Sequence, residues 1–134
     1  SSFTGWNLIL DELGGPNVGP FIGICGGLVT RDSESGEITF SGQYKAFSHI
    51  SGFITPESKI HSIILDKSFN QRICAYPENI REIEGVIIEN PDGKIFAVIV
   101  NPNDRAIQAQ LEIGGELFYL ELYADSVSTV EITK

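Results

Sequence analysis

Apolar and polar residues alternate along much of the second half of the chain. In AIQAQLEI (106–113) the odd-numbered positions are all apolar and, apart from Ala106, the even-numbered positions are polar, which places the two kinds on opposite sides of an extended backbone. Comparable runs rich in Ile, Val, Leu, Tyr and Phe follow one another between turn signals, as in all-β proteins. The expected strands are KIHSIIL (59–65), IEGVIIEN (83–90), KIFAVIVN (94–101), AIQAQLEI (106–113), LFYLELY (117–123) and TVEIT (129–133). Half-buried antiparallel strands are best covered by a second sheet, so the pattern predicts a β-sandwich, here of the Greek-key type.

Two strand pairs can be assigned from the turns between them. Asp92-Gly93 separates EGVIIEN from KIFAVIV, and both residue types tolerate the positive φ of a tight hairpin turn. Gly114-Gly115 separates AIQAQLEI from ELFYLELY in the same way. Each pair is therefore predicted to form an antiparallel hairpin.

The first part of the chain has a different pattern. FTGWNLIL (3–10) is almost continuously apolar, which favours a strand that is covered on both faces in a parallel sheet. A long loop follows, and SGQYKAFSHISGFI (41–54) then has apolar residues at helical spacing, with Ser41 as N-cap and Pro56 beyond the end. One βα unit cannot bury its own strand, so residues 1–55 are predicted to belong to a larger barrel and residues 56–134 to form the sandwich domain.

Composition and charge narrow the function classes. The chain has 134 residues and a net charge of −9, and its nine basic residues are scattered singly, which argues against a nucleic-acid partner. No apolar run is long enough to span a membrane. Cys25 and Cys74 lie far apart and, with only His49 and His61 as further candidates, fit no metal spacing. We expect two buried thiols and no metal site.

Neighbouring residues that could suggest catalysis have simpler interpretations. Adjacent carboxylates on an extended chain point in opposite directions, so Asp11 and Glu12 cannot flank one bond and are expected to be solvated loop charges. Ser48 and His49 diverge on a helix and form no catalytic triad, so His49 is expected to pack or cap locally. The many glycines before residue 28 match no phosphate-binding motif and indicate turns.

Several blocks of the sequence resemble one known family. They resemble the last barrel strand, the last βα loop, the last helix and the C-terminal sandwich of glycoside hydrolase family 30, which includes lysosomal glucosylceramidase and microbial β-1,6-glucanases. The blocks are WNLILDELGGPN (6–17), GPF (19–21), CGGLVT (25–30), GEIT (36–39), SGQYKAFSHIS (41–51) and NPDGKIFAVIVN (90–101). The resemblance covers nearly the whole chain except the segment 67–81.

The resemblance implies the C-terminal portion of a retaining β-glycosidase. Such enzymes use two carboxyl groups about 5 Å apart, which in this family are glutamates at the ends of the fourth and seventh strands of a (β/α)8 barrel. Neither strand has a counterpart here, so the chain would hold no catalytic residue, need no cofactor and be inactive alone. Its implied partners are the missing N-terminal barrel of the same protein and, through that barrel, a β-linked glucoside or oligosaccharide. The family usually works outside the cytosol, which favours an extracytoplasmic location.

Three residues are candidates for contact with the substrate. Trp6 matches the family tryptophan that lines the subsite of the reacting sugar, Asn7 is its neighbour at the strand end, and Asn17 matches the loop that shapes the pocket rim. Trp6 could instead be a core residue, and Asn7 could be a hydrogen-bonding residue of the strand end. Val18 and Lys45 stand where family members often have aromatic residues or, at the first position, histidine, which leaves the substrate open.

A second hypothesis comes from another class of protein. The chain could be a freestanding β-sandwich module that binds carbohydrate or protein, with Tyr76, Phe118, Tyr119 and Tyr123 as candidate exposed aromatics. The segment FTGWNLIL distinguishes the two hypotheses, because a freestanding module has no need of an apolar barrel strand.

Overall fold

A computed structural model describes residues 5, 7–16, 26–64 and 82–133, and everything stated below about the structure refers to these residues. The chain divides into two compact units, an N-terminal unit Ser1–Ser48 and a C-terminal unit His49–Lys134, which are described separately. The structure is mainly β, with one short helix. The elements are β1 (Ile9–Leu10), β2 (Val29–Arg31), β3 (Ile38–Phe40), α1 (Gly42–Ser51), β4 (Lys59–Ser62), β5 (Glu84–Glu89), β6 (Ile95–Asn101), β7 (Ile107–Ile113), β8 (Glu116–Leu122) and β9 (Ser126–Ile132).

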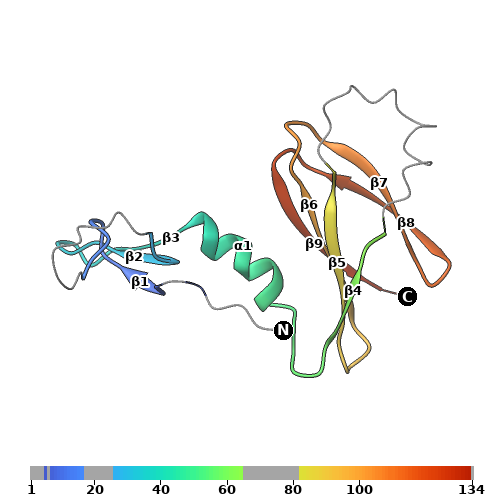
Figure 1. The fold of residues 1–134 in the computed structure, drawn as a ribbon, viewed down its shortest axis with the longest axis horizontal. Helices are drawn as coiled ribbons and strands as arrows, with labels where there is room; N and C mark the ends of the chain where they lie inside the picture. The colour runs from blue at the N-terminus through green and yellow to red at the C-terminus, as the bar shows by residue number, and fades with distance from the viewer. Residues whose placement is uncertain (1–4, 6, 17–25, 65–81, 134) are drawn as a thin grey trace. The chain divides into compact units, whose positions relative to one another are not determined.

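The C-terminal unit contains a four-stranded antiparallel sheet and a separate hairpin (Figure 1). The strand order in the sheet is β4-β5-β6-β9, and the hairpin is β7-β8. Both predicted hairpins are confirmed, with Ile87 opposite Ala97 in one and Gln110 opposite Tyr119 in the other. Gly93 has a φ of 85°, in the region where glycine is favoured, as the turn between β5 and β6 requires.

The sheet and the hairpin share a hydrophobic core. Alternate residues of β6 and β9 and of β7 and β8 supply its buried members, which are Ala97, Ile99, Leu111, Leu122 and Ile132. After β6 the chain crosses to the hairpin and returns as β9 beside β6, as the fourth strand of a Greek key does. The antiparallel sheets and their common core agree with the predicted β-sandwich.

The other face of the four-stranded sheet also holds buried apolar residues. Ile88, Phe96 and Val98 form a second cluster, and Phe53 packs on it with its ring 4.9 Å from that of Phe96. The end of α1 is attached to this sheet as well, because His49 Nδ1 lies 2.9 Å from Thr129 Oγ1 in β9. The sheet is thus covered on both faces, which explains why β6 is apolar at nearly every position.

The helix begins as the sequence predicts and ends slightly earlier. The predicted N-cap is confirmed, since the Tyr44 N–H donates to Ser41 Oγ at 3.2 Å. The helix ends at Ser51, before Gly52 and five residues before Pro56. No helix in the described ranges is both long and apolar enough to cross a bilayer.

The N-terminal unit contains a small mixed sheet. β1 pairs in parallel with β2, and β2 pairs antiparallel with β3. The strand expected over residues 3–10 is shorter than predicted, because only Ile9 and Leu10 form a strand among its described residues. Asn7 has a φ of 53°, and this left-handed backbone interrupts the extended run. That this unit belongs to a (β/α)8 barrel stays a prediction, as does the division at residues 55 and 56.

Candidate functional site

Only one of the three expected sugar-contacting residues lies within the described residues. Trp6 and Asn17 lie outside them. Asn7 precedes β1, is exposed, and accepts the Leu28 N–H through its backbone carbonyl at 3.4 Å. Its φ of 53° is an uncommon conformation for a residue other than glycine, although asparagine adopts it more readily than most. The side chain of Asn7 is therefore presented to solvent from a fixed backbone position, directly after Trp6 in the sequence.

Asp11 organises the loop that follows β1. One oxygen of its carboxylate accepts the backbone N–H of Leu13 at 2.9 Å and that of Gly15 at 2.6 Å. The backbone N–H of Asp11 also donates to the carbonyl of Gly15 at 2.8 Å, so the loop closes on itself. A Cβ on Gly15 would lie 2.6 Å from this carboxylate, which explains the glycine there. Asp11 is thus a structural residue of the Gly-Gly-Pro loop, a role that sequence reasoning missed.

The carboxylates of Glu12 and Asp32 hold neighbouring turns together. The hydroxyl of Ser33 donates to one oxygen of Glu12 and the Ser33 N–H to the other at 2.9 Å, and these bonds lower the pKa of Glu12. Asp32 accepts the N–H and the hydroxyl of Ser35, both at 2.7 Å, and these bonds lower the pKa of Asp32. Both groups are solvent-exposed acceptors in loops, and neither has the raised pKa of a catalytic acid.

Ser48 and His49 have separate partners, as their helical positions predict. Ser48 donates its hydroxyl to the carbonyl of Lys45 in the preceding turn at 2.6 Å. His49 Nδ1 contacts Thr129 Oγ1, and the Thr129 hydroxyl also lies 3.1 Å from the His49 carbonyl. His49 packs as expected, but against a strand eighty residues away in sequence and not against its own helix.

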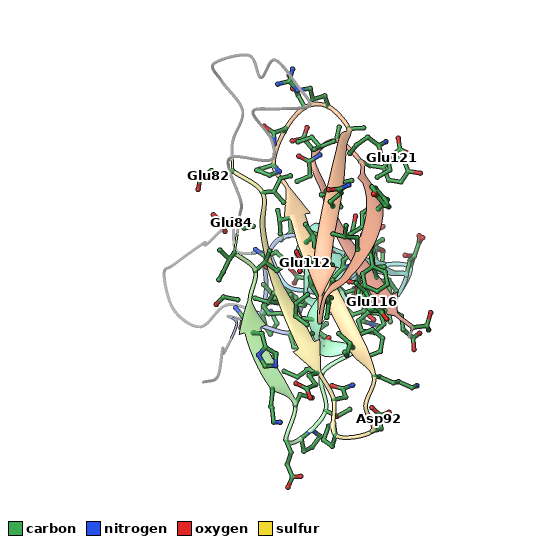
Figure 2. All side chains as sticks on the ribbon, turned by 90° about the vertical axis from the view of Figure 1, so that its right-hand side faces the viewer. Glu82, Glu84, Asp92, Glu112, Glu116 and Glu121 are labelled. Atoms are coloured by element: carbon green, nitrogen blue, oxygen red, sulfur yellow. The ribbon has the colours of Figure 1, made fainter. Side chains whose placement is uncertain are left out.

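The acidic side chains of the sandwich are spread around its surface. In Figure 2, Glu112, Glu116 and Glu121 lie along the β7-β8 hairpin, Glu82 and Glu84 lie near the start of β5, and Asp92 lies in the turn between β5 and β6. Among the described residues, no group of three or more His, Cys, Asp or Glu residues is arranged to hold a metal ion.

The N-terminal unit exposes many apolar side chains. Among its described residues, the large hydrophobic side chains at least 40% exposed are those of Leu8, Ile9, Leu13, Ile38, Phe40 and Tyr44. Ile9 lies in β1, whose parallel pairing with β2 is of the kind that proteins normally bury on both faces. The helix has no buried residue. This apolar surface, given by the six residues above, is the feature of the unit that a partner could cover.

The candidate aromatics of the sandwich differ in exposure. Phe118 packs against the core, and Tyr76 lies outside the described residues. Tyr119 is 73% exposed and Tyr123 is 67% exposed. Two of the four candidates are therefore available to a ligand.

Comparisons with known proteins relate this fold to parts of two larger solved structures. No family model and no curated protein sequence matches the chain. Among solved structures, SrfJ from Salmonella typhimurium is similar with a TM-score of 0.73 and 21% sequence identity over 96% of this chain. The endo-β-1,6-glucanase BT3312 is similar with a TM-score of 0.71 and 25% identity, also over 96% of this chain. The match covers 26% of the length of each of these two proteins.

These similar structures support the resemblance at the level of the fold. The chain has the fold of one part of two larger proteins, one of them a β-1,6-glucanase, and spans about a quarter of their length. This agrees with the C-terminal domain of a family 30 glycosidase.

Proposed function

We propose that this chain is the C-terminal portion of a retaining β-glycosidase, in which it completes a (β/α)8 barrel and supplies the side β-sandwich. The observation that carries the proposal is the exposed apolar surface of the N-terminal unit, combined with the parallel pairing of β1 and β2. Parallel strands with apolar residues on both faces need covering layers, and the remaining strands and helices of a barrel would provide them. A freestanding sandwich module leaves this surface unexplained.

In the proposed protein the two catalytic carboxylates come from the rest of the barrel. They stand about 5 Å apart and act as nucleophile and as acid/base. This chain contributes binding groups: the Trp6 indole packs against the apolar face of the sugar ring, Asn7 offers its amide to a hydroxyl, and Asn17 lies at the pocket rim. The substrate is a β-linked glucoside or oligosaccharide, and the protein acts outside the cytosol, as the family resemblance implies.

The first test is to read the coding DNA upstream of Ser1 in frame. We expect further βα repeats with a glutamate at the ends of the fourth and seventh strands. A start codon or a secretion leader directly before Ser1 would contradict the proposal and favour the freestanding module.

The second test is enzymatic and uses the chain alone and joined to that upstream segment. We expect hydrolysis of 4-nitrophenyl β-D-glucoside or of β-1,6-glucan only by the joined protein. In that protein Trp6→Ala should lower kcat/KM by about tenfold or more, because the stacking contact is lost, whereas Trp6→Phe should retain most of it. Hydrolysis by the 134-residue chain alone, or equal activity of the alanine and phenylalanine variants, would refute the corresponding part of the proposal.

A third test measures the exposed surface directly. We expect the 134-residue chain to self-associate through its N-terminal unit in sedimentation velocity, because no barrel covers the apolar surface. Ile9→Ser together with Phe40→Ser should reduce the association, since both side chains are more than half exposed. A matched pair of serine substitutions at the exposed Ile60 and Leu117 of the C-terminal unit should have little effect. A chain that stays monomeric at high concentration would argue against a covered surface.

A further inference from the structure

The β7-β8 hairpin has an outer face that the core does not use. Its inner residues, such as Leu111 and Leu122, are buried in the sandwich. The alternate residues form the outer face, where Gln110 lies opposite Tyr119 and Gln108 opposite Glu121. Tyr119 is 73% exposed, which leaves most of its ring in contact with solvent. We call these four residues the hairpin face.

On the hairpin face, Gln108, Tyr119 and Glu121 are exposed and Gln110 is half-buried. Within the described part of the chain, Gln108, Gln110, Tyr119 and Glu121 have no side-chain hydrogen bond or ion pair. Two amides, a phenol and a carboxylate thus offer donors and acceptors around one exposed aromatic ring. Tyr123 directly follows β8, lies an even number of residues after Tyr119 and is 67% exposed. It therefore extends the aromatic surface of the same strand face past the strand end.

The charge around the face limits the ligands it can take. Residues 82–133 contain ten acidic residues and two basic ones, Lys94 and Arg105. An anionic ligand such as a phosphate or a uronic acid polymer would be repelled, because residues 82–133 hold no cluster of cations to bind it. A neutral ligand rich in hydroxyl groups suits the face, since amides can both donate to and accept from hydroxyls and an aromatic ring packs on the C–H face of a sugar.

We propose that the hairpin face is an accessory binding site for a neutral, β-linked glucan chain, separate from the pocket to which Trp6 is expected to contribute. The Tyr119 ring packs against one sugar unit, and Gln108, Gln110 and Glu121 bond to its hydroxyls and to those of the next unit. Tyr119 and Tyr123 are four residues apart, about 13 Å along an extended strand, which is longer than one sugar ring and favours an oligosaccharide over a monosaccharide. The choice of a glucan rests on the proposed function, and the site itself rests on the hairpin.

The experiment is binding of the full 134-residue chain to soluble linear β-1,6-glucan, measured by affinity electrophoresis and by NMR titration of amide resonances. We expect retardation in the gel and shifts centred on β7 and β8. Tyr119→Ala should weaken binding about tenfold, because the stacking surface is lost, whereas Tyr119→Phe should bind like the original chain because the ring remains. Glu131→Ala, at an exposed position of β9, is the off-site control and should leave binding unchanged.

Each outcome decides the inference. Absence of glucan binding at millimolar concentration, or equal binding by the Tyr119→Ala and Tyr119→Phe variants, would overturn it. If polylysine bound tightly and shifted the amide resonances of β7 and β8 while glucan did not bind, the inference would be overturned in favour of a basic protein partner. The proposed glycosidase can be refuted separately. Glucan binding through Tyr119 in a protein whose gene encodes no upstream barrel would confirm this site and contradict the proposed enzyme.

Discussion

Replacing the buried side chain of Asn101 gives the strongest test of which contacts stabilise the sandwich. Asn101 lies at the end of β6 and is fully buried. Its amide nitrogen is 2.9 Å from the carbonyl oxygen of Arg105, 3.1 Å from that of Leu122 and 2.8 Å from that of Tyr123. Its amide oxygen accepts the Asn103 N–H at 3.1 Å. One side chain thus joins the β6-β7 loop to the end of β8.

Replacing this side chain with alanine should be costly. Asn101→Ala removes every one of these bonds, including the fully buried ones that join Asn101 to the Leu122 carbonyl and to the Asn103 N–H. Losing such a bond costs a buried polar group about 1–3 kcal/mol, so the two buried contacts together predict a loss of about 2–6 kcal/mol. Since a domain is stable by about 5–15 kcal/mol, this is a large share of the total.

The assay is urea unfolding followed by far-UV circular dichroism, with the free energy of unfolding taken from the midpoint and slope. Gln108→Ala on the exposed face of β7 is the matched amide control and should change stability by less than about 0.5 kcal/mol. Asn101→Asp should also destabilise at neutral pH, because a carboxylate cannot donate to the three carbonyls. A loss below about 0.5 kcal/mol for Asn101→Ala would refute the reasoning, since it would mean that water replaces the amide without cost.

Three further results are expected. Gly85→Ala should destabilise the sandwich by about 1–3 kcal/mol in the same assay, because its Cβ would lie 2.8 Å from the Val98 carbonyl oxygen; an unchanged midpoint would mean that β5 can move away. A double-mutant cycle with His49→Ala and Thr129→Val should give a coupling energy of about 1 kcal/mol if their hydrogen bond attaches the helix end to β9, and additive effects would deny it. The pKa of Asp32, measured by NMR titration, should lie below the usual value of about 3.9, so the turn is stabilised above that pH and loosens as the pH falls through the lowered pKa; a normal or raised value would contradict the hydrogen bonds seen here.

The sandwich could be predicted from sequence because its signals are local. Each β7 residue is apolar or polar according to the face it occupies, and the turns at Gly93 and Gly114 restrict which strands can pair. The pairing of β9 with β6 was not predictable in the same way, since no turn connects them and the choice depends on packing across the core. β2 and β3 were missed because three-residue strands are too short to show alternation.

The candidate site was less accessible to sequence reasoning. The helix position of Ser48 and His49 was enough to reject a triad, and the structure agrees. The structural role of Asp11 depends on a loop that closes on Gly15, and only the spacing of an aspartate before a glycine pair could have hinted at it. The role of Asn101 is partly non-local, because two of its partners, Leu122 and Tyr123, lie at the end of β8 and directly after it.

The order of the strands also limits when the sandwich can fold during synthesis. β6 is flanked by β5, its immediate neighbour in sequence, and by β9, which is made some thirty residues later. The two hairpins can form early, since their contacts are local, but one side of β6 stays unpaired until residues 126–132 have left the ribosome. An apolar central strand therefore spends part of translation with an open edge, and a truncation before Ser126 should leave it permanently so. Chaperone dependence and the loss of soluble protein on such truncation would follow from the topology alone.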